Sequence, residues 1–176
     1  MNYEEKIRCH NEAVKFLGSR MRTEKELREK LKEKGFCESV VDETVEEAKK
    51  LKYIDDYQYA LLYFEYAYGK KRGKYRIFKE LEKKGILREI SEEALYEYNS
   101  VNKVDEYSTA LEIAFEELKR NIYSIKNCKD IYEKKKNIKK ILGSIARKLQ
   151  NLGYEKDVIY GVLDNLKNSL AEERSI

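Results

Sequence analysis

A short pattern that occurs three times constrains this chain more than any other feature of its sequence. Two apolar residues stand four apart, and a glycine follows four residues after the second of them, at Gly35, Gly85 and Gly153. Apolar residues four apart share one face of a helix, and glycine suits the left-handed position just beyond a helix end. Further apolar residues follow each glycine at helical spacing. Each copy therefore predicts a helix, a glycine stop and a second amphipathic helix.

A third helix precedes each of these pairs, so the sequence predicts nine helices in three triplets. The chain has no proline and only 8 glycines among 176 residues, which excludes a strand-rich sandwich or barrel and favours an all-α class. A three-helix unit of this size buries little apolar surface alone, so we expect stacked neighbours to share a core. The predicted helices span residues 3–19, 23–34, 38–52, 55–69, 73–84, 90–99, 103–122, 129–151 and 155–170.

The predicted repeats occupy residues 1–52, 53–100 and 101–176. The glycines are spaced by 50 and then by 68 residues, so the third repeat carries about 18 extra residues, which we place in a loop at 121–130. Thr23 and Glu26 have the spacing of a capping box at the start of the second helix. Asp55 or Asp56 is expected to cap the fourth helix, and Ser91 the sixth.

Positive charge gathers in the second repeat, although the formal excess of the whole chain is only +4. Residues 69–88 hold nine cations against two glutamates, and the corresponding helix of the first repeat is mostly acidic at the matching positions. A docking surface for an acidic partner explains this difference, and a merely solvated face stays the alternative. Four of the cations follow at i, i+4, i+7 and i+11, on a stripe away from the apolar face: Arg72, Arg76, Lys79 and Lys83. The weaker candidates for partner contact are Lys70, Lys74, Tyr75 and Arg147.

A second basic cluster runs from Lys126 to Lys148, again with nine cations against two acids. Its run of three lysines at 134–136 could bind phosphate, but most such runs are simply hydrated. Seven tyrosines fall between Tyr53 and Tyr75, and aromatic rings beside cations suit single-stranded nucleic acid or a protein interface. Of these tyrosines, we expect Tyr59, Tyr63 and Tyr66 to fill core.

Signals of catalysis, metal binding and membrane insertion fail in this sequence. Three widely spaced cysteines and the single His10 cannot form a zinc site of standard spacing, and we interpret the cysteines as free buried thiols of a reducing cytoplasm. No phosphate-binding glycine loop, nucleophile elbow or zinc-protease motif occurs. No apolar run approaches the roughly 20 residues that span a membrane, and the first residues do not resemble a signal peptide. We therefore expect a cytoplasmic protein that is not an enzyme and needs no metal or cofactor.

Two stretches of the chain form its most specific motifs: Tyr53-Ile-Asp-Asp56 with Ala60, and Gly73-Lys-Tyr-Arg-Ile-Phe-Lys-Glu-Leu-Glu-Lys-Lys-Gly-Ile86. They resemble the RecX family, regulators of the bacterial recombinase RecA, and the likeness extends over nearly the whole chain. Arg20-Met-Arg-Thr-Glu-Lys-Glu-Leu27 matches the helix start of the family's first repeat. The third repeat departs from the family, which often has Arg-Arg-Gly-Phe where this chain has Gln150-Asn-Leu-Gly-Tyr154.

The resemblance implies an elongated, curved array of three tandem three-helix repeats that binds the RecA–DNA filament as a monomer. It implies inhibition of strand exchange, of ATP hydrolysis and of SOS coprotease activity, with weak binding to single- or double-stranded DNA. Our hypothesis is that the array lies in the filament groove and spans neighbouring protomers. Two alternatives stay open: a stand-alone nucleic-acid-binding protein, for which the basic clusters and tyrosines suffice, and an inert helical scaffold.

Overall fold

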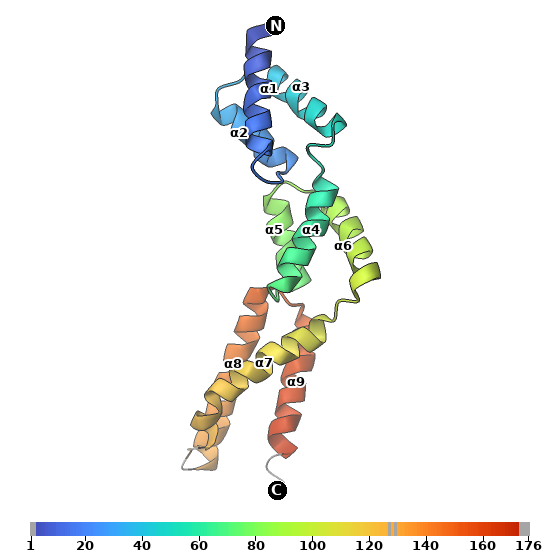
Figure 1. Cartoon of the computed structure of the whole chain (residues 1–176). Coiled ribbons are helices and arrows are strands. Elements are labelled where there is room, and N and C mark those ends of the chain that lie inside the picture. The colour runs from blue at the N-terminus through green and yellow to red at the C-terminus, as the bar shows by residue number, and fades with distance from the viewer. Residues whose placement is uncertain (1–2, 127, 129, 173–176) are drawn as a thin grey trace. The chain divides into compact units, whose positions relative to one another are not determined.

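All regular secondary structure in the described part of the chain is helical (Figure 1). The computed structural model describes residues 3–126, 128 and 130–172, which contain nine α-helices and no β-strand. The predicted all-α class and helix order are confirmed. The helices are α1 Tyr3–Leu17, α2 Glu24–Glu33, α3 Glu38–Lys50, α4 Asp56–Gly69, α5 Lys74–Lys83, α6 Arg88–Asn102, α7 Glu106–Lys126, α8 Ile131–Leu152 and α9 Lys156–Glu172.

The three repeated glycines end the second helix of each triplet, as predicted. Gly35, Gly85 and Gly153 have φ values of +83°, +85° and +88°, a left-handed conformation that a side chain would strain. In each case the residue after the glycine donates its N–H to the carbonyl of the second apolar residue of the pattern. The N–O distances are 3.4 Å for Phe36 to Leu31, 3.1 Å for Ile86 to Leu81 and 3.2 Å for Tyr154 to Leu149. These bonds close a Schellman-type helix end in all three copies.

The helix starts agree with the sequence in two of three cases. The Thr23 hydroxyl accepts the Glu26 N–H at 3.2 Å, and the Asp55 carboxylate accepts the Gln58 N–H at 3.1 Å. Asp55 is therefore the residue that caps α4. The prediction that Ser91 caps α6 is wrong, because α6 already begins at Arg88 and the buried Ser91 hydroxyl donates to the Leu87 carbonyl at 3.1 Å.

The extra residues of the third triplet lengthen its helices. Helix α7 has 21 residues and α8 has 22, whereas α4 has 14 and α5 has 10. The predicted loop at 121–130 is therefore wrong for residues 121–126, which belong to α7, while residues 127 and 129 lie outside the described residues. No proline or glycine occurs between 121 and 130 to stop a helix, and Asp130 caps α8 by accepting the Glu133 N–H at 2.7 Å.

The chain divides into two compact units. Unit 1 runs to Tyr66 and includes Phe78–Asn102, and its first core lies among α1, α2 and α3. There, Leu27 and Leu31 of α2 meet Val41 and Val45 of α3, all four fully buried. Also in unit 1, the buried Phe64 ring of α4 contacts Phe78 of α5 edge-on at 5.8 Å and stacks on Tyr98 of α6 at 6.3 Å between centroids.

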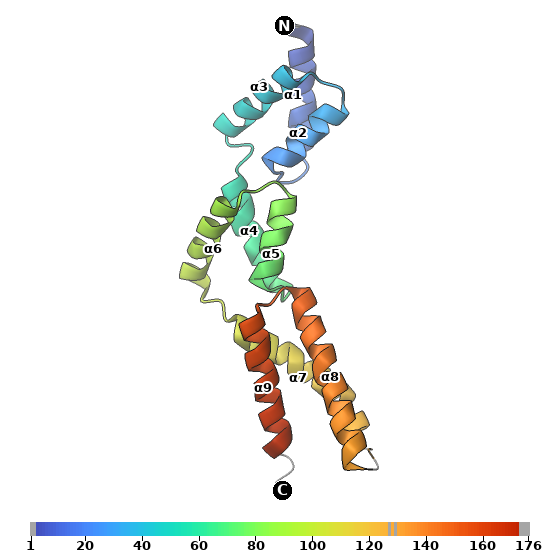
Figure 2. The ribbon, with the colours of Figure 1, turned by 180° about the vertical axis from the view of Figure 1, so that it is seen from behind.

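Unit 2 consists of Ala67–Ile77 and the residues from Lys103 onward. Helix α7 lies across α8 and α9, as the two opposite views show (Figures 1 and 2). Ile145 and Leu149 of α8 pack with Ala114 of α7 and with Val162 and Leu166 of α9 to form its core. The segment Ala67–Ile77, the end of α4 and the start of α5, belongs to this unit by its contacts.

Candidate partner-binding surface

The predicted contact residues lie on two helices and on one connection. Lys70 and Arg72 are in the link between α4 and α5, so Arg72 precedes the helix that carries the rest of the stripe. Arg147 is exposed on α8. The remaining five residues are all on α5: Lys74, Tyr75, Arg76, Lys79 and Lys83.

Helix α5 separates its basic residues from its apolar ones. Ile77 and Leu81 are fully buried, as the spacing predicted. Lys79 and Lys83 are exposed, and so is 55% of Tyr75. These side chains expose two ammonium groups and an aromatic ring, while Ile77 and Leu81 on the other side of the helix are buried.

Other cations of the 69–88 segment are engaged by glutamates from outside it. Ion pairs join Lys71 to Glu112 at 2.9 Å and Lys74 to Glu155 at 3.0 Å in unit 2. In unit 1, Lys84 pairs with Glu26 at 2.9 Å and Arg88 with Glu92 at 2.6 Å. The local excess of charge in the sequence is therefore partly compensated in the fold.

Arg76 also holds the start of α5 against the end of α8, and Lys74 holds it against the start of α7. The Arg76 Nη1 donates to the carbonyl of Asn151 at 3.2 Å, and the Lys74 N–H donates to Glu106 Oε1 at 2.7 Å. These two candidates have structural contacts of their own, so a loss of function on their replacement has two explanations. Lys79 and Lys83 are the exposed lysines of the same helix.

Helix α8 carries a second basic face. Lys136, Lys140 and Arg147 follow at i, i+4 and i+11 with Lys139 beside them, and all four are exposed. Ile141, Ile145 and Leu149 face the core of unit 2 from the other side of α8. The side chain of Tyr132, one turn before Lys136, is 79% exposed. From this face the sequence singled out only Arg147, although the spacing of the lysines was the signal that could have found the others. Lys129 and the side chain of Lys126, at the start of that cluster, lie outside the described residues.

The tyrosines of α4 divide between core and surface. Tyr59 is buried and Tyr63 is half-buried, with its hydroxyl donating to Glu80 at 2.9 Å. Tyr66 is 52% exposed, so its predicted place in the core is wrong. Its ring packs against the ring of Tyr63, with 6.0 Å between centroids, on the surface rather than in the core.

The cysteines are free, as predicted, but only Cys9 is buried; Cys37 is exposed and Cys128 partly so. Burial raises the pKa of the Cys9 thiol. Across the described residues no cluster of three or more His, Cys, Asp or Glu side chains has the arrangement of a metal site. No helix in the described ranges has the length and apolarity to span a membrane.

Comparison with known families gives one match within the first triplet. The family described as "RecX, first three-helix domain" matches residues 9–47, which cover most of α1, α2 and most of α3.

Curated proteins named Regulatory protein RecX align with part of the chain. The one from Caldanaerobacter subterraneus subsp. tengcongensis is 37% identical over 83 residues, which are 45% of this chain and 42% of that protein. The one from Clostridium perfringens strain SM101 is 34% identical over 80 residues, 44% of this chain and 38% of that protein. The aligned segments thus span less than half of the length of these relatives.

Solved structures extend the likeness to nearly the whole chain. The crystal structure of RecX from Lactobacillus salivarius superposes with a TM-score of 0.76 at 24% identity, over 94% of this chain and 99% of that one. A second crystal structure of a regulatory protein RecX gives a TM-score of 0.67 at 22% identity, over 91% of this chain and 72% of that one. At these identities the superpositions establish the fold, a helical array of three-helix repeats.

The match in the first triplet, the aligned curated relatives and the shared fold agree with the resemblance of the sequence motifs. The resemblance of this chain to the RecX family of regulatory proteins is therefore confirmed.

Proposed function

We propose that this protein modulates the RecA recombinase, as an inhibitor that binds the RecA–DNA filament and suppresses strand exchange, ATP hydrolysis and SOS coprotease activity. The observation that carries the proposal is the exposed basic surface of α5, with Lys79, Lys83 and Tyr75, on a chain of the RecX family. A filament of recombinase on DNA offers phosphates and acidic side chains to such a surface. No catalytic step is assigned to the protein, which acts by binding as a monomer in the cytoplasm.

The proposed mechanism is occlusion. Cations on α5 and α8 contact the filament groove, and the helical repeats lie across neighbouring protomers, so that substrates are excluded and the subunit interface is disturbed. Contacts to phosphate weaken steeply as salt rises, because each one releases condensed counterions. Inhibition is therefore expected to fall with ionic strength.

The test is the ATPase activity of RecA on single-stranded DNA with increasing amounts of this protein. The native chain is expected to inhibit. The double variant Lys79→Glu/Lys83→Glu is expected to need about tenfold more protein or more for half-inhibition, because two attractive charges become repulsive.

The matched control is Lys15→Glu/Lys50→Glu, which makes the same change in net charge at exposed lysines of α1 and α3. It is expected to inhibit like the native protein. Equal losses in the two double variants would show that net charge alone matters and would contradict a contact on α5. Circular dichroism at 222 nm checks that each variant stays helical.

The α8 face favours a second function, stand-alone binding of nucleic acid. Lys136, Lys139, Lys140 and Arg147 form a basic helix face with the exposed Tyr132 ring nearby, a combination that suits a single strand. Titration of a labelled single strand in the absence of RecA separates the two functions. Tight binding to the naked strand, together with no effect on the RecA ATPase, would favour this second function.

A further inference from the structure

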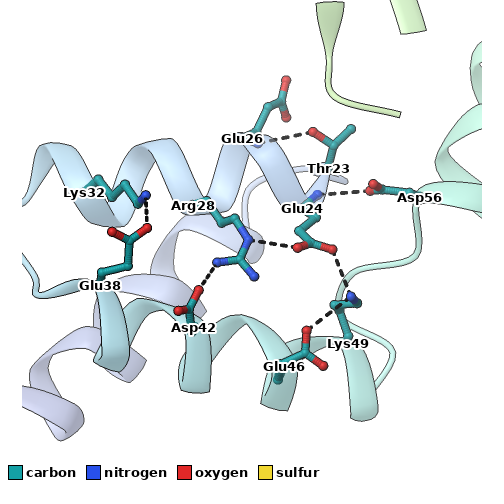
Figure 3. Close-up of polar contacts among 10 residues, drawn as sticks. All are labelled: Thr23, Glu24, Glu26, Arg28, Lys32, Glu38, Asp42, Glu46, Lys49 and Asp56. Atoms are coloured by element: carbon teal, nitrogen blue, oxygen red, sulfur yellow. Dashed lines mark hydrogen bonds and ion pairs between the residues drawn. The ribbon is translucent and has the colours of Figure 1, made fainter. Parts of the chain in front are cut away.

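Within unit 1, the start of α2 is held by residues from the second triplet, of which Figure 3 shows Asp56 beside Glu24. The Glu24 N–H, at the first residue of α2, donates to Asp56 of α4 at 3.0 Å. The Thr23 hydroxyl donates to the carbonyl of Lys84, beside the glycine turn at Gly85, at 2.7 Å. Lys25 adds a bond from its ammonium group to the carbonyl of Lys83 at 3.0 Å. Because the first N–H groups of a helix have no partner inside it, the Asp56 carboxylate satisfies one of them, while the turn accepts bonds from the Thr23 and Lys25 side chains.

Within unit 2, the start of α5 is held in the same way by residues of the third triplet. The Lys74 N–H, at the first residue of α5, donates to Glu106 of α7 at 2.7 Å. The Gly73 N–H donates to the carbonyl of Leu152 at 2.8 Å, and the Tyr75 N–H donates to the carbonyl of Gly153 at 3.1 Å. The Arg76 guanidinium reaches the carbonyl of Asn151 at 3.2 Å.

The acceptors of the two sets occupy equivalent positions of the repeat. Glu24 and Asp56 lie 50 residues before Lys74 and Glu106, the spacing of the first two glycines. Lys84 and Lys83 lie 68 residues before Leu152 and Asn151, the spacing of the second and third glycines. Three acceptors thus recur in register: one carboxylate and two turn carbonyls.

At two of the glycine turns, another segment of the chain lies close to the glycine Cα. A Cβ added to Gly85 would lie 2.4 Å from the Cβ of Lys25, and one added to Gly153 would lie 2.2 Å from the Cβ of Arg76 and 2.5 Å from its backbone nitrogen. A Cβ on Gly35, the equivalent glycine of the first triplet, would meet no atom within 4 Å. Glycine ends a helix at all three sites, but only Gly85 and Gly153 also receive a helix start from another triplet.

We propose that these contacts form one joint used twice, which docks the second helix of a repeat onto the next repeat. The joint has a donor side, the N-terminus of α2 or α5, and a receiving side, an acidic residue at the start of α4 or α7 together with the glycine turn after α5 or α8. This inference concerns the assembly of the array and is independent of the partner that the array binds.

The third triplet has no equivalent donor side among the described residues. Helix α8 runs without interruption from Ile131 to Leu152, so the residues that correspond to Gly73 and Lys74, Ile141 and Leu142, lie inside a helix and already have helical partners for their N–H groups. The lengthening of α7 and α8 thus removes the helix start on which the joint depends.

Amide hydrogen exchange on the full chain, followed residue by residue by NMR, tests the joint. Glu106→Ala removes the acceptor of the Lys74 N–H, so exchange at the Lys74 amide is expected to accelerate about tenfold or more, while the Glu24 amide keeps its native rate. Asp56→Ala is the matched variant with the reverse expectation, faster exchange at Glu24 and an unchanged rate at Lys74. This crossed pattern supports two separate joints. Native rates at both amides in both variants would overturn the proposal.

A comparison of glycines tests the receiving turn. Gly153→Ala and Gly35→Ala both place a side chain in the left-handed region, but only the former also meets a helix start. Faster exchange at the Gly73 and Tyr75 amides is expected in Gly153→Ala, and native rates there in Gly35→Ala. If Gly153→Ala accelerates exchange only at the end of α8, the glycine is no more than a helix stop and the joint is overturned. Should Gly153→Ala fail to fold, the crossed pair at Glu106 and Asp56 decides by itself.

Discussion

Burial and hydrogen bonding act in opposite directions on the carboxylates of Asp56 and Glu106. Burial raises the pKa of both, although the N–H donors of Glu24 and Lys74 act to lower it. Lys49 and Tyr68 also favour the charged forms of Asp56 and Glu106 respectively. The other carboxylates near them, Glu24 and Asp55 for Asp56 and Glu155 for Glu106, add to the rise.

The raised pKa of Glu106 gives a testable pH dependence. Because its pKa in the folded state lies above that of an unfolded chain, protonation favours folding, and this contribution to stability grows as pH falls through the folded pKa and is complete below the unfolded pKa. In urea denaturation at pH 7 and pH 5, native stability is therefore expected to improve relative to Glu106→Gln on acidification. A constant difference between the two proteins at both pH values would contradict this.

The pKa of Glu117 is shifted in the opposite direction, downward. Its hydrogen bond with Lys148, at 2.6 Å between α7 and α8, lowers its pKa. The stability that this pair provides is present at neutral pH and is lost as pH falls through the lowered pKa. Glu117→Gln is expected to cost about 0.5–1 kcal/mol at pH 7 and nearly nothing at pH 2, measured by urea denaturation. The variant Glu116→Gln, at the exposed neighbouring position, is the control and is expected to change little.

For single residues, the sequence was most informative where a residue type has one structural role at that position. Gly35, Gly85 and Gly153 were predicted as left-handed helix ends because other residues pay a steric cost there, and their φ values confirm it. Ser91 was misread because serine both caps helices and bonds back to a carbonyl within them. Tyr66 was wrongly predicted to be buried, because helical spacing near an apolar stripe does not show whether a ring at its edge points to the core or to solvent.

The side chains near the helix starts differ in whether they accept an open N–H group of the first turn. The Asp105 carboxylate accepts the Ser108 N–H at 3.0 Å and caps α7, whereas the Ser91 hydroxyl only adds a second bond to the carbonyl of Leu87, the residue before α6. Asp105→Ala is expected to cost about 1 kcal/mol of stability, because it leaves an N–H of the first turn without its acceptor. Ser91→Ala is expected to cost less than half of that. Thermal unfolding of the two variants checks the order, and an equal cost would restore Ser91 as a cap.

The lengthened α7 and α8 show what element prediction from one sequence leaves out. When the third repeat is aligned with the other two, its extra residues have no counterpart in them, and such an insertion was interpreted as a loop. The absence of proline and glycine at 121–130 was the better guide, because nothing there stops a helix. The basic face of α5 followed from spacing alone, since i, i+4 neighbours share a face whatever the tertiary structure, whereas on α8 the same spacing was overlooked for the lysines. The contact of Arg76 could not be predicted, because a main-chain carbonyl such as that of Asn151 carries no sequence signature.

The whole chain holds its apolar residues in more than one core. One lies among α1, α2 and α3 around Leu31, and another among α7, α8 and α9 around Leu149, and both leucines are fully buried. In repeat proteins, stability is approximately a sum of local terms and neighbour interfaces. The division into repeats at 1–52, 53–100 and 101–176 stays a prediction, which the recurrence of the joint supports.

The two leucines allow a paired test of this organisation. Leu31→Ala and Leu149→Ala are each expected to cost about 2–5 kcal/mol, the range for a buried leucine that leaves a cavity. Hydrogen exchange is expected to accelerate mainly in α1–α3 for the first variant and mainly in α7–α9 for the second. Uniform acceleration along the whole chain in either variant would instead indicate a single cooperative unit.

The bonds that Gly73 and Tyr75 make with the α8 turn use main-chain atoms on both sides, and main-chain atoms are the same in every residue. These bonds restrict Gly73 and Gly153, whereas Leu152 and Tyr75 contribute only main-chain atoms to them. In a saturation mutagenesis screen, Gly73 and Gly153 should therefore tolerate fewer substitutions than the exposed Tyr75. The surface beside them can then diverge toward a new partner without loss of the fold.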